Sequence, residues 1–353
     1  MQNNDRPLVV AAEGPVLDEI QRLAAAVGCD ADQVADLEAA RGRWTEAPLV
    51  LVDDAVAGAA AGLPKRDDVL LVCAGKPPPS AWRRAFVLGA EDVVALPDTD
   101  GVLVTALADV AEGPSPQRGR VLAVVGGRGG AGASVLAAAV ALGVAKSGGD
   151  ALLVDCDSLG GGIDLVLGAE LEGGLRWPEL RVQAGRVSMA ALDDALPGID
   201  HGAGRLAVLS CDRDGPGPAP DAVAAVVAAG TRAGRVVVCD LPREPGPSGD
   251  QVLRLADLVV LVVPAELRAC VAASRVLANL GDSRGRVRVL ARGPSLDGLT
   301  GRDVADAVGA PLLGWLRPDR RLAKALERGS FNPRRRSSLG AATRAVLDEL
   351  HAA

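Results

Sequence analysis

The stretch VLAVVGGRGGAGAS, from Val121 to Ser134, decides the fold of this 353-residue chain. Its apolar start predicts a buried strand, its glycines predict a tight loop, and the alanine-rich segment that begins at Ser134 predicts a helix. The spacing G-x-x-x-x-G-x-S runs from Gly127 through Gly132 to Ser134. Such a loop directs backbone N–H groups and a helix N-terminus at a phosphate. We therefore predict a phosphate-binding P-loop, the alternative being a purely structural glycine turn.

The predicted loop departs from the usual P-loop at one position. Ala133 stands where the lysine belongs. A charge-assisted hydrogen bond to phosphate contributes about 1.5–3 kcal/mol, so the loss is expected to weaken binding roughly ten- to a hundredfold. Arg128, earlier in the loop, can supply a cation. The predicted nucleotide-binding residues are Gly127, Arg128, Gly129, Gly130, Ala131, Gly132, Ala133 and Ser134, and Ser134 is also a predicted Mg²⁺ ligand.

Two later strands end in carboxylates. ALLVDCD ends in Asp155 and Asp157, and RVVVCD ends in Asp240. Carboxylates at the ends of parallel strands, beside a phosphate loop, predict a magnesium site. The predicted metal ligands are Ser134, Asp155 and Asp240. For Asp157 the alternative is the N-cap of a helix.

The loop resembles the deviant Walker A box of the ParA/MinD family, K-G-G-x-G-K-S/T, with Arg128 at its first, signature lysine and Ala133 at its second. The resemblance implies ATP and Mg²⁺ as ligands and a homodimer that sandwiches ATP, into which the signature residue reaches. It also implies that Asp157 positions the attacking water, which makes it the predicted catalytic residue, and that Asp240 binds Mg²⁺ through water. For Arg128 the alternative is an ordinary surface arginine.

One feature of that family is missing here. The family usually places an asparagine after the penultimate strand, where it reads the adenine. The corresponding stretch in this chain is VRVLARGP, residues 287–294, which contains no asparagine. The departure affects base recognition in addition to phosphate binding, so either weak ATPase activity or none is compatible with the sequence.

The chain before the loop predicts a smaller domain in which strands and helices alternate. The predicted strands are Pro7–Ala12, Pro48–Val52, Val69–Ala74 and Asp92–Ala95, and the predicted helices are Val16–Val27, Asp32–Arg41, Ser80–Leu88 and Gly101–Ala111. Such alternation predicts a small doubly wound sheet. We therefore predict a domain over residues 1–111, a linker over 112–120 and a P-loop domain over 121–353.

The element order of the first domain resembles a response-regulator receiver (CheY-like) domain. Asp53 falls at the phosphoacceptor position, but only one acid, Glu13, follows the first strand and no lysine follows the last. Phosphotransfer in receivers needs Mg²⁺, and one acid binds it poorly. We interpret the domain as a pseudo-receiver used for interaction or localisation, the alternative being a phosphorylated switch.

The second domain repeats the alternation on a larger scale, which predicts a parallel sheet with ligands at the carboxyl ends of its strands. The predicted strands are Val121–Val125, Ala151–Val154, Leu206–Leu209, Val236–Cys239, Leu258–Val263, Val287–Leu290 and Leu312–Trp315. The predicted helices are Ser134–Lys146, Asp221–Ala229, Gln251–Ala256, Ala269–Asn279, Gly301–Val308 and Leu339–Leu350.

Composition narrows the function classes. The net charge of −7 gives no global attraction to nucleic acid or anionic membranes. Six scattered cysteines without a CxxC pair favour buried thiols in a reducing cytosol over a disulfide or metal role, and two histidines argue against a histidine metal site. We expect a cytoplasmic protein with no signal peptide and no transmembrane helix, or one held peripherally at the inner face of the plasma membrane.

A basic cluster lies near the C-terminus: Arg317, Arg320, Arg321, Lys324, Arg328, Arg334, Arg335 and Arg336. It favours a solvated helix face and loop over nonspecific DNA binding. For the last helix, packing on the sheet is favoured over a membrane anchor, because the helix lacks lysines and aromatic side chains.

A receiver-like domain followed by a ParA/MinD-like domain resembles the CpaE-like proteins, in particular the actinobacterial subgroup described as septum-site-determining or as neighbours of a secretion ATPase. The resemblance implies a spatial regulator of septum placement in cell division, or of a pilus or secretion apparatus, with proteins of those machines as partners and membrane association through them. The alternatives are a nucleotide-independent interaction scaffold and an active ATPase that uses Arg128 in place of lysine.

Overall fold

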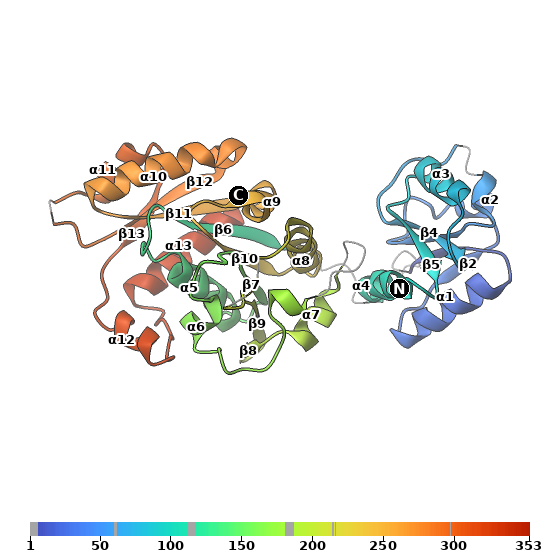
Figure 1. The fold of residues 1–353 in the computed structure, drawn as a ribbon, viewed down its shortest axis with the longest axis horizontal. Helices are drawn as coiled ribbons and strands as arrows, with labels where there is room; N and C mark the ends of the chain where they lie inside the picture. The colour runs from blue at the N-terminus through green and yellow to red at the C-terminus, as the bar shows by residue number, and fades with distance from the viewer. Residues whose placement is uncertain are drawn as a thin grey trace. The chain divides into compact units, whose positions relative to one another are not determined.

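The computed structural model describes residues 6–59, 62–111, 118–180, 187–213, 215, 217–296 and 298–353 (Figure 1). Internal contacts divide the chain into two compact units, Met1–Pro114 with Val182–Ala190 and Ser115–Arg181 with Ala191–Ala353. The stretch 112–117 of the predicted linker lies outside the described residues.

The first unit is a five-stranded parallel sheet in the order β2-β1-β3-β4-β5. Its strands are β1 (Leu8–Val10), β2 (Asp32–Val34), β3 (Val50–Asp53), β4 (Val69–Ala74) and β5 (Asp92–Leu96), and its helices are α1 (Pro15–Ala26), α2 (Leu37–Ala40), η2 (Ala57–Ala59), α3 (Pro79–Leu88) and α4 (Asp100–Ala111). One apolar core joins the sheet to α1 and α4, and a second joins its other face to α2 and α3. The predicted doubly wound sheet is confirmed, and its strand order is the one found in CheY.

The predicted helix over Asp32–Arg41 is wrong. Its first residues form β2, which pairs in parallel with β1, with Asp32 opposite Leu8. The helix starts later, because Asp36 accepts a hydrogen bond from the backbone N–H of Ala39 at 2.8 Å and so caps α2. A three-residue edge strand is too short to show a two-residue period, and its stability comes from pairing with a neighbour that is distant in sequence.

The second unit is an eight-stranded sheet in the order β13-β12-β11-β6-β10-β7-β9-β8. Its strands are β6 (Arg120–Gly126), β7 (Ala151–Asp155), β8 (Gly198–His201), β9 (Gly204–Leu209), β10 (Val236–Leu241), β11 (Leu258–Pro264), β12 (Val287–Arg292) and β13 (Leu312–Leu316). All seven predicted strands are present, and they pair in parallel. The additional edge strand, β8, is antiparallel to β9.

The helices after β6 are α5 (Ala133–Lys146), α6 (Ile163–Leu167), η3 (Trp177–Glu179), α7 (Met189–Ala195), α8 (Pro220–Arg232), α9 (Gly246–Leu255), α10 (Leu267–Asn279), η4 (Gly281–Arg286), α11 (Gly301–Val308), α12 (Leu322–Glu327) and α13 (Ser338–Ala352). All belong to the second unit except the first two residues of α7. All the predicted helices are present. The α-helices missed by sequence reasoning are α6, α7 and α12, which have five to seven residues each. Elements this short cannot display a helical period.

Helix α5 forms the centre of the larger core. Most of its residues are buried, and they pack with Leu153 and Val238 of the sheet. Helix α13 lies beside α5 (Figure 1). A Cβ atom at Gly143 of α5 would lie 2.5 Å from the Cγ2 atom of Thr343, so glycine lets α13 approach closely. Helix α8 packs against the side chains of Leu152 and Val237, which lie on the face of the sheet opposite to α5. The larger unit is therefore also doubly wound.

The last helix packs on the sheet, as predicted. Leu339, Val346 and Leu350 of α13 are buried in the core built around α5. Within the described ranges, no helix combines the length and the apolar character needed to span a lipid bilayer. All six cysteines are unpaired and buried.

Candidate nucleotide site

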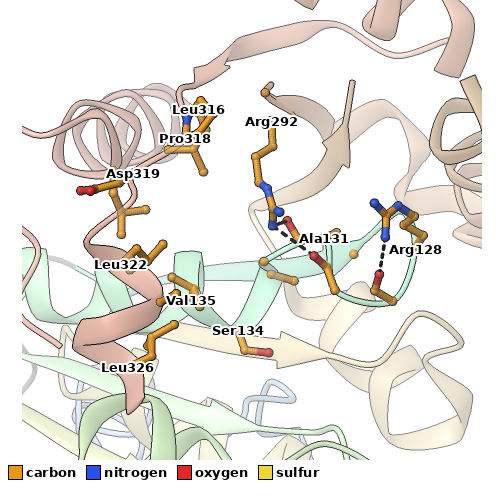
Figure 2. A pocket seen from close by; sticks show the side chains of 18 of the residues that line it. Arg128, Ala131, Ser134, Val135, Arg292, Leu316, Pro318, Asp319, Leu322 and Leu326 are labelled. Carbon is orange, nitrogen blue, oxygen red and sulfur yellow. Dashed lines mark hydrogen bonds between the residues drawn. The ribbon is translucent and has the colours of Figure 1, made fainter. Parts of the chain in front are cut away.

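The predicted site residues meet at the carboxyl edge of the larger sheet. The loop after β6 and the ends of β7, β10, β12 and β13 surround an open pocket of about 580 Å³ (Figure 2). Both Asp157 and Asp240 line this pocket together with Gly129–Ser134 of the loop. A parallel α/β sheet binds its ligands at this edge, because loops from neighbouring strands diverge there.

The loop has the conformation that its glycines predict. Gly130 and Gly132 adopt φ of +68° and +96°, in the left-handed region, and Gly132 is the N-cap of α5. The backbone N–H of Leu136 donates to the carbonyl of Gly132 at 3.0 Å, which begins the helix directly after the loop. The positive end of the α5 dipole therefore faces the pocket.

Gly127 is required for packing. A Cβ atom there would lie 2.8 Å from the Cβ of Ala273 and 3.3 Å from the carbonyl oxygen of Val262. We expect Gly127→Ala to lower the free energy of unfolding by about 1–3 kcal/mol. The matched control is Gly129→Ala, because nothing lies within 4 Å of its Cβ position; its effect should stay within about 0.5 kcal/mol. Urea unfolding followed by circular dichroism measures both, and equal losses would contradict this packing role.

Asp240, at the end of β10, is almost fully buried, with 3 % of its surface exposed. The Ser134 side chain lies near its carboxylate and favours the ionised form. Burial raises the pKa of Asp240 to about 8, Ser134 opposes the shift, and the charges of Asp155 and Asp157 add to it. Among the described residues, its Oδ1 atom has no hydrogen-bond partner. A cation in the pocket would satisfy this oxygen and stabilise the ionised form.

The residues present fit a magnesium ion that arrives with a nucleotide. Ser134 and Asp240 offer a hydroxyl and a carboxylate oxygen, the hard ligands that Mg²⁺ prefers. No group of three or more His, Cys, Asp or Glu in the described part of the chain could hold a metal ion. Magnesium bound by one or two protein oxygens takes its remaining ligands from phosphates and water, so the ion is expected to depend on the nucleotide.

Asp155 has a different environment from the other two carboxylates. Its Oδ1 accepts from the N–H of Asp157 at 3.0 Å, and its Oδ2 accepts from the N–H groups of Ile163 and Cys211 at 2.9 and 3.2 Å and from the Ser210 hydroxyl at 3.3 Å. Burial raises its pKa, and these backbone hydrogen bonds oppose the shift. We interpret Asp155 as the group that ties three segments together; its predicted place near Mg²⁺ stays a prediction.

Asp157 lies in the pocket and caps no helix. Its Oδ1 accepts from the N–H of Leu159 at 3.2 Å in a local turn, and its carbonyl accepts from the N–H of Gly160 at 3.0 Å. The next helix, α6, begins at Ile163 with Gly162 as its N-cap. The N-cap alternative for Asp157 is therefore wrong, and its carboxylate is available to the pocket.

Arg128 is paired on its own chain. Its Nη2 donates to Oε1 of Glu266 at 2.7 Å, and its Nη1 donates to the carbonyl of Gly129 at 3.0 Å. In Figure 2 it lies at the opposite end of the loop from Ser134. The pairing neutralises much of its charge within one chain, while its role across a dimer stays a prediction.

Sequence reasoning missed part of the pocket wall. Arg292, the last residue of β12, lines the pocket and touches the loop. Opposite it, β13 and α12 supply an apolar wall with Leu316, Leu322 and Leu326 (Figure 2). Arg292 could have been found from its place at the end of a predicted strand of the same sheet; α12 had no comparable signal.

In the described part of the first unit, the predicted acidic residues lie in different environments from one another. Asp53 is buried, and its Oδ1 accepts from the N–H of Ala55 at 3.0 Å. Both oxygens of Asp54 accept from Arg84, at 2.7 and 2.6 Å. Glu13 is exposed. The pseudo-receiver interpretation stays a prediction.

Known proteins share this architecture. The cell division ATPase MinD of Pyrococcus furiosus matches with a TM-score of 0.55 and 19 % identity, over 66 % of this chain and 99 % of that one. The septum site-determining protein MinD of Pyrococcus horikoshii, solved with Mg-ADP, matches with a TM-score of 0.51 and 18 % identity, over 65 % and 95 %. The second unit therefore has the ParA/MinD-like P-loop fold.

The family follows from closer relatives. Residues 9–118 match the family model described as the Rv3660c-like, CheY-like N-terminal domain. The uncharacterized protein Rv3660c of Mycobacterium tuberculosis is 41 % identical over 338 residues, which cover 94 % of each chain. This chain belongs to the Rv3660c-like family, with a CheY-like domain followed by a ParA/MinD-like domain.

Proposed function

We propose that this chain is a spatial regulator whose second domain binds ATP with Mg²⁺ and, in the nucleotide-bound state, helps to place the division septum or a pilus or secretion apparatus. The observation that carries the proposal is the pocket that joins the phosphate loop, with Ser134, to the buried carboxylate of Asp240. The Mg-ADP in the P. horikoshii MinD structure, which shares the fold, supports the choice of ligand.

Each part of the pocket has a task in this proposal. The loop N–H groups and the α5 N-terminus bind the phosphates, and Ser134 and Asp240 hold Mg²⁺. The ion, when bound, neutralises charge on the phosphate oxygens. Asp157, with its carboxylate facing the pocket, orients the attacking water. Loss of the loop lysine at Ala133 makes binding weak and turnover slow.

The other domain and the partners complete the proposal. The pseudo-receiver serves interaction or localisation, and ATP links two chains into a homodimer through Arg128. Cell-division, pilus or secretion proteins bind this ATP-linked homodimer and bring the chain to the membrane. Nonspecific DNA binding by the exposed arginines near the C-terminus is not favoured. The competing function is a nucleotide-independent scaffold, which the absence of a lysine at Ala133 supports.

Titration of the full-length protein with ATP and Mg²⁺ tests the proposal, with heat of binding, phosphate release and molar mass followed together. We expect saturable binding, a slow phosphate release that Asp157→Asn abolishes, and binding retained in that variant. Absence of binding at millimolar ATP would leave only the scaffold. Binding without turnover indicates a switch that does not hydrolyse ATP. An ATP-dependent dimer lost in Arg128→Ala would assign that arginine to the partner's nucleotide.

A further inference from the structure

Arg292 is held rigidly at the rim of the pocket. Its carbonyl accepts from the N–H of Ala265 at 2.8 Å, and the next residue, Gly293, donates to the carbonyl of Leu316 at 2.9 Å. These bonds tie the end of β12 to both neighbouring strands, β11 and β13. A Cβ atom at Gly293 would lie 2.8 Å from the Trp315 ring, so the chain turns away tightly after Arg292. The origin of the Arg292 side chain is therefore fixed by the sheet.

The guanidinium reaches across to the phosphate loop. Its Nη1 donates to the carbonyl oxygens of Gly130 at 3.1 Å and Ala131 at 2.7 Å (Figure 2). The same nitrogen lies 3.0 Å from the Cβ position of Gly132. Its positive charge therefore contacts two loop carbonyls and lies beside Gly132, directly before Ala133, where the lysine is missing.

Most of this guanidinium remains available. Only Nη1 is used in the two contacts, and within the described residues Nε and Nη2 donate to no protein atom. Arg128, by contrast, is paired with Glu266. Both arginines line the pocket and contact the loop, but among the described residues only Arg128 shares its charge with a carboxylate, and both Nε and Nη2 of Arg292 remain free. A guanidinium presents planar paired donors that match phosphate oxygens.

We infer that Arg292 supplies from β12 the cation that Ala133 has removed from the loop, and that its free donors bind the phosphate chain of a nucleoside triphosphate. The inference rests on the proposed nucleotide binding and names the residue that makes it feasible. In the ligand-free protein the guanidinium braces the loop carbonyls; with ligand, its remaining donors bind phosphate oxygens.

Calorimetric titration of the full-length protein tests the inference with two probes, ATP with Mg²⁺ and inorganic tripolyphosphate with Mg²⁺. Arg292→Gln removes the charge, and its amide nitrogen falls about where Nε lies in arginine, short of the loop carbonyls that Nη1 contacts. We expect it to weaken binding of both probes about ten- to a hundredfold, the range for losing a charge-assisted hydrogen bond. The control is Arg302→Ala, since Arg302 is exposed and is not among the residues that line the pocket, so the affinity for both probes should stay unchanged.

A variant that restores the loop lysine, Ala133→Lys, provides the decisive comparison. In the Ala133→Lys background, Arg292→Gln should cost much less affinity, because the two cations would serve the same phosphates. Unchanged affinity in Arg292→Gln while the wild type binds both probes would overturn the inference and leave Arg292 a loop brace. A loss confined to ATP would also overturn it, by assigning Arg292 to the base. If the wild type binds neither probe, the proposed nucleotide binding itself fails, and the inference fails with it.

Discussion

Replacing Asp240 by asparagine is expected to stabilise the nucleotide-free protein at alkaline pH and, in the same variant, to abolish its stabilisation by Mg²⁺ and ATP. Burial holds the folded-state pKa of this carboxyl at about 8, against an ordinary value of 3.8. Between these values the unfolded chain has lost the proton while the folded chain retains it. Unfolding therefore becomes more favourable as pH rises from about 4 to about 8.

Asparagine removes this dependence because it does not ionise. Each unit of pKa shift corresponds to about 1.4 kcal/mol, so the gain in unfolding free energy near pH 8 should be roughly 2–5 kcal/mol. Urea unfolding between pH 5 and pH 9, with a chelator present, measures it. The gain should shrink toward pH 5, because the Asp240 carboxyl of the folded protein stays protonated there and resembles the amide.

The control for this prediction is Asp319→Asn, since Asp319 lines the same pocket but is exposed. The free energy of unfolding of Asp319→Asn should follow the same pH dependence as that of the wild type. Addition of Mg²⁺ and ATP should raise the melting temperature of the wild type and of this control, but not that of Asp240→Asn. If Asp240→Asn were less stable than the wild type at pH 8, the buried environment assigned to Asp240 would be refuted. If Mg²⁺ and ATP still raised the melting temperature of Asp240→Asn, its assignment as a ligand of Mg²⁺ would be refuted.

The parts of this site that sequence could predict are encoded locally. The glycine spacing from Gly127 to Gly132 needs only the chain on either side of it, and a strand that ends in Asp240 is recognisable from its apolar run. Parallel topology then brings these ends together, because every crossover returns the chain to the same edge. The structure accordingly places Asp157 and Asp240 beside the loop.

The parts that could not be predicted depend on contacts between segments distant in sequence. Arg292 meets the loop carbonyls 161 and 162 residues away. The role of Asp155 is set by Ser210 and Cys211, 55 and 56 residues downstream. An aspartate at a strand end looks the same whether its oxygens face a cation or a set of N–H groups. Periodicity contains no information on that choice, which tertiary packing makes.

Asp155 and Asp157 are therefore expected to differ in their response to substitution, the first affecting stability and the second activity. Asp155→Ala should lower the free energy of unfolding by roughly 3–5 kcal/mol, because it leaves several buried donors without an acceptor. Asparagine at this position should be nearly as harmful, since its NH₂ group would face N–H donors on one side or the other. Both effects are read from urea unfolding of the nucleotide-free protein.

Asp157→Ala is the matched control, two residues further on. Its carboxylate accepts one N–H, from Leu159 at 3.2 Å, at a partly exposed site, so stability should change by no more than about 1 kcal/mol. Phosphate release should nevertheless disappear, because the group that faces the pocket is gone. If Asp155→Ala were as stable as the wild type, its oxygens would not be the anchor of the three segments. If Asp157→Ala unfolded as readily as Asp155→Ala, the motif would be structural throughout, and the water-orienting role of Asp157 would lose its support.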